Sequence, residues 1–86
     1  MNIVEFLRDN NIKYWESGKN VSAGYVNIKC LFCSDTFNHL GIRISDLKCN
    51  CWKCGRKSIT TIVKKIYYFN NFEQTIASAH RILFLL

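Results

Sequence analysis

The chain contains two copies of one short motif, Cys30-Leu31-Phe32-Cys33 and Cys51-Trp52-Lys53-Cys54, and seventeen residues separate them. Two residues between paired cysteines form a tight turn that aims both thiolates at one point. A hairpin between the motifs brings the second pair opposite the first and completes a tetrahedron of sulfur ligands. The spacing therefore predicts one structural zinc ion per chain. Its predicted ligands are Cys30, Cys33, Cys51 and Cys54.

The length of 86 residues indicates a single small domain. A chain of this size buries only about 60–65% of its unfolded surface, so its apolar core leaves it marginally stable. Structural zinc contributes roughly 10–16 kcal/mol of apparent binding free energy in small peptides, and this becomes folding energy when the unfolded chain has no site. We therefore expect the segment between the motifs to be largely unfolded without metal.

The cysteine count places the chain in a reducing compartment. Five cysteines are an odd number, and no basic-then-apolar signal segment precedes the first predicted helix. The fifth, Cys49, lies two residues before Cys51 on a predicted strand and shares its face. It is expected to be a packed free thiol. No apolar run approaches the roughly twenty residues that cross a bilayer. We expect a cytoplasmic protein that has no membrane partner and no small-molecule substrate.

The net charge of +6 is concentrated in the middle of the chain. Residues 1–28 and 66–86 each carry equal numbers of basic and acidic side chains. Residues 29–65 hold eight basic side chains against Asp35 and Asp46. Cations gathered around a metal-braced hairpin are typical of a protein that binds a phosphate backbone, and a solvated basic face is the alternative.

Hydrophobic periodicity predicts a small α+β domain. Its centre is a zinc ribbon, an antiparallel hairpin sheet over residues 25–57, and the predicted helices cover about residues 2–9, 58–69 and 72–86. Apolar residues alternate at Leu40, Ile42 and Ile44, which predicts a strand there, and Gly55 follows the last ligand, where a positive φ is needed. The second helix is expected to leave Lys64 and Lys65 in water.

The residues around the cysteines resemble a known family. Cys30-x-x-Cys33 followed after seventeen residues by Cys51-Trp52-Lys53-Cys54-Gly55 looks like the N-terminal zinc-binding domain of bacterial and phage DNA primases. Asn38-His39-Leu40-Gly41-Ile42, the lead-in Asn11-Ile12-Lys13-Tyr14 and the helix from Ser58 also resemble the phage versions. Bacterial primases usually have histidine at the position of Cys33. The four-cysteine set therefore shifts the resemblance toward phages and mobile elements.

The resemblance implies a module that engages single-stranded DNA template and assists primer synthesis. Catalysis would belong to a polymerase or primase domain, fused or separate, and a helicase is a further expected partner. The six acidic residues are scattered singly and offer no paired carboxylates for the magnesium ions of nucleotidyl transfer. The chain by itself is therefore not expected to be an enzyme.

Particular side chains are candidates for DNA contact. Basic residues around the hairpin would bind phosphates, and aromatic residues would stack on bases. His39 has three possible roles: a zinc ligand, a structural hydrogen bond or a template contact. The full predicted nucleic-acid-binding set is Arg43, Lys48, Lys53, Arg56, Lys57, Trp52, Phe37 and His39.

Two other functions stay open. The first is a zinc adaptor that docks on a polymerase or helicase without touching DNA. The concentration of basic charge argues against protein contact as the only role of the chain. An iron electron carrier has the same cysteine spacing, but the basic charge disfavours it.

Overall fold

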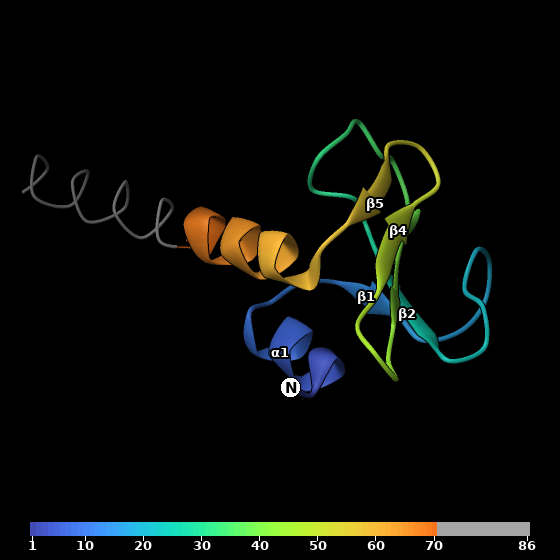
Figure 1. Ribbon diagram of the computed structural model, residues 1–86, viewed down its shortest axis with the longest axis horizontal. Helices are drawn as coiled ribbons and strands as arrows, with labels where there is room; N and C mark the ends of the chain where they lie inside the picture. Colours follow the sequence, from blue (N-terminus) through green and yellow to red (C-terminus); the bar gives the residue numbers. More distant parts are fainter. Residues whose placement is uncertain (71–86) are drawn as a thin grey trace, which may run out of the picture.

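The computed structural model describes residues 1–70, which form a small α+β unit. Five strands make one antiparallel sheet in the order β1-β2-β3-β4-β5, so each strand pairs with its neighbours in the sequence (Figure 1). A second helix covers residues 59–70. The labelled elements are α1 (Ile3–Asp9), β1 (Tyr14–Trp15), β2 (Tyr25–Ile28), β3 (Leu40–Arg43), β4 (Cys49–Cys51) and β5 (Gly55–Lys57).

The strand register gives the sheet an apolar inner face. Val26 pairs with Ile42 and Ile42 with Cys49, while the next row joins Ile28, Leu40 and Cys51. Directly opposed residues of antiparallel strands point to the same face, so these six side chains form one surface. All six are buried, and they share a core with Ile3 and Leu7 of α1 and with Ile62 and Ile66 of the second helix.

The opposite side of the sheet, here called the outer face, carries the alternate residues of the same strands. Asn27 pairs with Gly41, Gly41 with Asn50, and Asn50 with Arg56. Tyr25 pairs with Arg43 in the adjoining row. This face therefore combines basic, amide and aromatic side chains.

Both helices begin with a capping side chain. Asn2 Oδ1 accepts a hydrogen bond from Glu5 N at 3.1 Å, and Ser58 Oγ accepts one from Thr61 N at 3.1 Å. The helices lie next to each other beside the sheet (Figure 1). The Phe6 and Tyr67 rings meet edge to face with centroids 5.8 Å apart, so the N-terminal helix helps to hold the second one.

Three expectations need correction. The strand expected to include Ile44 ends at Arg43, because Leu47 N donates to Arg43 O at 2.7 Å and closes a turn that leaves Ile44 47% exposed. A further strand, β5, follows the second motif and was not expected. Lys65 is half-buried and not in water, with Nζ 5.9 Å from the centre of the Phe32 ring.

Of the other expectations for secondary structure, one is confirmed and one concerns residues that the structure does not describe. The predicted hairpin between the motifs is present, and the two-residue strand β1 adds to the sheet before it. The expected helix over residues 72–86 lies outside the described residues. Within residues 1–70, none of the helices has the length and apolar character needed to cross a membrane.

Candidate metal centre and basic surface

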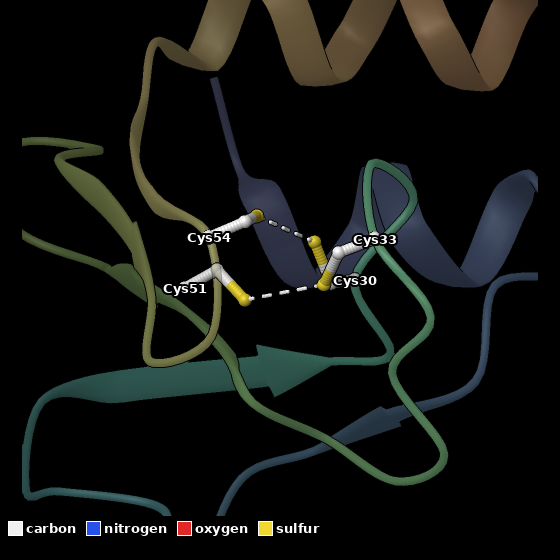
Figure 2. A group of neighbouring side chains, drawn as sticks. All are labelled: Cys30, Cys33, Cys51 and Cys54. Atoms are coloured by element: carbon white, nitrogen blue, oxygen red, sulfur yellow. Dashed lines mark hydrogen bonds between the residues drawn. The ribbon is translucent and has the colours of Figure 1, made fainter.

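Two turns that face each other position the four cysteines. Cys30 and Cys33 lie just beyond the end of β2, and Cys51 and Cys54 lie where β4 turns into β5. The side chains converge (Figure 2), and all four sulfur atoms lie within 4.8 Å of one another. The Sγ atoms of Cys30 and Cys54 are 3.6 Å apart, and those of Cys33 and Cys51 are 3.8 Å apart.

These distances match a tetrahedral metal site. A tetrahedron with metal–sulfur bonds of about 2.3 Å has edges of about 3.8 Å, whereas a disulfide needs about 2.05 Å. The four cysteines form no disulfide, and their sulfur atoms stand at the separation that one metal ion requires. The donor set is positioned to bind one metal ion, and four thiolates suit zinc or iron.

The two turns share one local geometry. Phe32 N donates to Cys30 Sγ at 3.4 Å, and Lys53 N donates to Cys51 Sγ at 3.4 Å. Each bond joins a ligand sulfur to the amide two residues later, which favours the thiolate. Gly55 ends the second turn with φ of 95°, as the sequence predicts. A side chain is strained in that conformation.

Burial and hydrogen bonding act in opposite directions on the thiols. Burial raises the pKa of Cys30 to about 12. Burial also disfavours the Cys51 thiolate, but hydrogen bonds from the backbone N–H groups of Lys53 and Cys54 and from the thiols of Cys30 and Cys54 together bring the pKa of Cys51 below its ordinary value. A metal cation compensates the cost of a buried thiolate, so it fits this pocket of sulfur atoms.

A buried carboxylate braces the first turn. Asp35 is 3% exposed and accepts hydrogen bonds from the backbone N–H groups of Cys30, Phe37 and His39 at 2.9, 3.0 and 2.9 Å. Its Oδ1 also lies 2.6 Å from His39 Nδ1. Burial alone would raise the pKa of Asp35, but these four bonds bring it well below its usual range. In the sequence, Asp35 stands out only as one of the two acidic residues of the basic segment.

The structure therefore gives His39 a structural contact. Its ring is held by Asp35, and it does not belong to the group of four sulfur ligands. Cys49 also lies apart from that group, as expected. The residue is 5% exposed, and its thiol lies 3.2 Å from Leu47 O and has a pKa raised by burial to about 11.

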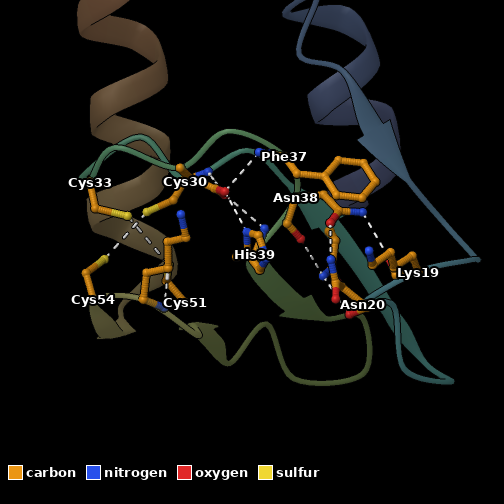
Figure 3. A network of polar contacts seen from close by, with 12 residues as sticks. Lys19, Asn20, Cys30, Cys33, Phe37, Asn38, His39, Cys51 and Cys54 are labelled. Carbon is orange, nitrogen blue, oxygen red and sulfur yellow. Dashed lines mark hydrogen bonds and ion pairs between the residues drawn. The ribbon is translucent and has the colours of Figure 1, made fainter.

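Three asparagines join the turn at residues 18–21 to the loop before β3. Asn38 Nδ2 donates to Lys19 O at 3.1 Å, and Asn20 Nδ2 donates to Asn38 Oδ1 at 2.8 Å (Figure 3). Asn27 Nδ2 donates to the backbone oxygens of Asn20 and Asn38 at 3.0 and 2.8 Å. Asn27 and Asn38 are both buried. Neither was expected in the core, because both are polar and Asn27 alternates with the apolar residues of its strand.

The structure brings four of the predicted DNA-contacting cations together. An open hollow of about 710 Å³ lies over β3, β4 and β5. Arg43, Lys48, Arg56 and Lys57 line it, together with Tyr25 and Asn50. Arg43 is also paired with Asp46, whose oxygens accept from Nε and Nη2 at 2.9 and 2.6 Å.

The other predicted contact residues lie outside this hollow. Trp52 is 76% exposed, and Lys53 beside it is also exposed. Phe37 is half-buried, and its ring meets Trp15 edge to face with centroids 5.4 Å apart. Phe37 and His39 therefore serve as packing and bracing groups in this structure, and Trp52 is the predicted stacking residue with the most open surface.

Comparisons with protein-family models, with curated proteins and with solved structures find no match.

Proposed function

We propose that the chain is a zinc-dependent module that binds single-stranded DNA template and assists primer synthesis. It would act as part of a primase or polymerase, or as a small subunit serving a separate one. The observation that carries this proposal is the hollow over β3, β4 and β5, which four of the predicted cations line. The exposed Trp52 lies outside the hollow, next to Tyr25 and Asn50 of its lining.

Zinc is the metal that we propose for the four-cysteine site. Structural zinc sites are closed by four protein ligands, and four thiolates at tetrahedral separation supply them without an open position. The ion would join the β2 end to the β4–β5 turn. It would thereby hold the strands that carry the basic side chains, so DNA binding would depend on the metal.

The cations suit a phosphate backbone. Arg43, Arg56 and Lys57 come from two strands, and Lys48 comes from the turn between β3 and β4. An open groove lined by one sign of charge attracts a polyanion, and each neutralised phosphate releases a counterion.

Trp52 supplies the second element of a single-strand site. Its side chain is 76% exposed although it lies between two metal ligands. Stacking of a base on an aromatic ring contributes about 1–3 kcal/mol and tolerates every base. A duplex keeps its bases stacked on each other, so this contact favours single strands.

The role in priming rests on the resemblance between the two cysteine motifs and the zinc-binding domains of primases. We propose no catalytic role for the chain itself, and the polymerase that joins nucleotides would be its partner. The two acidic residues near the basic segment are engaged locally, Asp35 with the first turn and Asp46 with Arg43. Neither is presented as a ligand for catalytic magnesium.

A protein adaptor is the second candidate, and one observation favours it. The second helix exposes a run of aromatic residues: Tyr67 is 52%, Tyr68 63% and Phe69 44% exposed. Large exposed apolar surface often marks a contact with another protein. In this version the helix would dock on a polymerase or helicase, and the outer face would have no DNA partner.

Fluorescence anisotropy with a short labelled oligonucleotide separates the two candidates. The zinc-loaded chain should bind single strands with an affinity that falls as salt rises, and Arg56→Gln should reduce the logarithmic salt slope by about 0.7. Lys64→Gln is the matched control, because Lys64 is exposed on the second helix and does not line the hollow. Absence of salt-dependent binding, alone and with the partner polymerase, would favour the adaptor.

A further inference from the structure

A small cavity on the outer face contains an unusual buried acceptor. The cavity of about 120 Å³ lies between Asn20, Ser22, Tyr25, Asn27, Gly41, Asn50 and Trp52. Asn27 is 1% exposed, and its Oδ1 is the buried side-chain oxygen or nitrogen that lacks a hydrogen-bond partner in the described part of the chain. Buried polar atoms are nearly always paired, so this one requires an explanation.

The orientation of the Asn27 amide is fixed by its other end. Nδ2 donates to two backbone oxygens, those of Asn20 and Asn38, at 3.0 and 2.8 Å. Rotating the amide by half a turn would place Oδ1 against both oxygens, which offer no proton. The acceptor is therefore held toward the outer face, and only an N–H or O–H donor satisfies it.

Gly41 leaves space beside this oxygen. A Cβ at position 41 would lie 3.2 Å from Asn27 Oδ1 and 3.4 Å from Tyr25 Cδ2. The backbone there does not have a positive φ, so the conformation of the strand does not require glycine. The lack of a side chain instead keeps the space above Oδ1 clear. The half-buried Tyr25 borders the same space, and Oδ1 itself is buried, so a side chain at the rim has to move before a donor reaches the oxygen.

The cavity adjoins the basic hollow. Tyr25 and Asn50 line both, and the exposed Trp52 forms part of the cavity wall. A strand whose phosphates lie in the hollow therefore passes the mouth of the cavity. Its volume equals that of about four water molecules, which restricts an occupant to a group the size of one base edge.

We propose that this cavity is a base-reading subsite, in which Asn27 Oδ1 accepts a hydrogen bond from the exocyclic amino group of an unpaired base. The subsite rests on the proposed function, because the hollow must first hold the phosphate backbone. It adds base preference to a surface that otherwise binds any single strand. The amino group replaces solvent at Oδ1, and Trp52 stacks on the same base or its neighbour.

The test compares two oligomers on the unaltered zinc-loaded chain: oligo(dC), and the same oligomer with each cytosine replaced by 2-pyrimidinone, which has hydrogen in place of the amino group. One hydrogen bond to a buried acceptor should make oligo(dC) bind about three- to tenfold more tightly. Salt slopes for the two oligomers should be equal, since their phosphates are identical.

Two variants identify the source of the difference. Gly41→Ala places a methyl group against Oδ1 and should abolish the preference while it keeps the salt slope, the circular dichroism spectrum and the zinc content. Arg56→Gln should weaken both oligomers equally and keep the preference. Any part of the affinity difference that comes from stacking would persist in Gly41→Ala. The part that is lost in this variant therefore measures the hydrogen bond to Oδ1.

The outcomes distinguish this inference from the proposed function. Equal affinity of the unaltered chain for both oligomers, with a steep salt slope, would overturn the subsite and leave the single-strand function standing. A preference of the same size in folded Gly41→Ala as in the unaltered chain would also overturn it. If neither oligomer binds, the proposed function fails and the subsite fails with it.

Discussion

Replacing Asp35 by alanine should release the first cysteine turn. Three backbone N–H groups, those of Cys30, Phe37 and His39, would lose a buried charged acceptor. Each buried donor left without a partner costs about 1–3 kcal/mol, so we expect a total loss of about 3–6 kcal/mol after some relaxation. The whole stability of a domain is about 5–15 kcal/mol, so the variant would be at the edge of folding.

The zinc affinity reports this loss directly, because metal binding and folding are coupled. A loss of about 3–6 kcal/mol corresponds to apparent zinc binding weaker by about two to four powers of ten. Competition with a coloured zinc chelator at neutral pH measures it. His39→Ala keeps the three backbone bonds to Asp35 and removes the ring contacts with Asp35 and Phe37, so it should weaken zinc binding by about one power of ten or less.

The matched control is Asp46→Ala, which removes an exposed carboxylate from the β3–β4 turn and should leave zinc affinity close to that of the unaltered chain. The reasoning is wrong if Asp35→Ala binds zinc within about threefold of the unaltered chain. It is also wrong if the Asp46 and Asp35 variants lose affinity equally.

Three further outcomes follow from the same geometry. Cys51→Ser should abolish zinc binding and Cys49→Ser should keep one zinc per chain, measured by native mass spectrometry; the reverse pattern would refute the ligand assignment. Gly55→Ala should destabilise the zinc-loaded chain by about 1 kcal/mol in urea unfolding, because alanine is strained at a φ of 95° although nothing lies within 4 Å of its Cβ. Asp46→Asn should tighten single-strand binding and steepen its salt dependence, because it frees the Arg43 guanidinium; unchanged binding would show that Arg43 makes no phosphate contact.

The sequence predicted the metal-binding turns because their information is local. Two residues between cysteines define a turn, and Gly55 marks the positive φ that ends it. The caps of both helices were also visible, since a capping residue and the amide it binds lie three residues apart. The meeting of the two turns was predicted from spacing, and the sulfur positions confirm that they converge.

Contacts that the turns and loops make after folding were missed. Ile44 continues the alternation of β3, but the Arg43–Asp46 turn ends the strand first. Asp35 reads as an exposed turn residue, and only the folded loop shows three amides directed at it. Asn27 occupies an outward position on a strand, yet its partners Asn20 and Asn38 bury it. A polar residue buried by other loops leaves no periodic signal in the sequence.

The most direct test of the account is whether single-strand binding requires the metal. Anisotropy of a labelled single-stranded oligonucleotide would be followed over a salt series with the zinc-loaded chain, the chelator-treated chain and the chain after zinc is restored. We predict salt-dependent binding by the zinc-loaded chain, affinity weaker by about tenfold or more after chelation, and recovery on adding zinc. Equal binding by the loaded and stripped chains, or no salt-dependent binding by the loaded chain, would contradict the account.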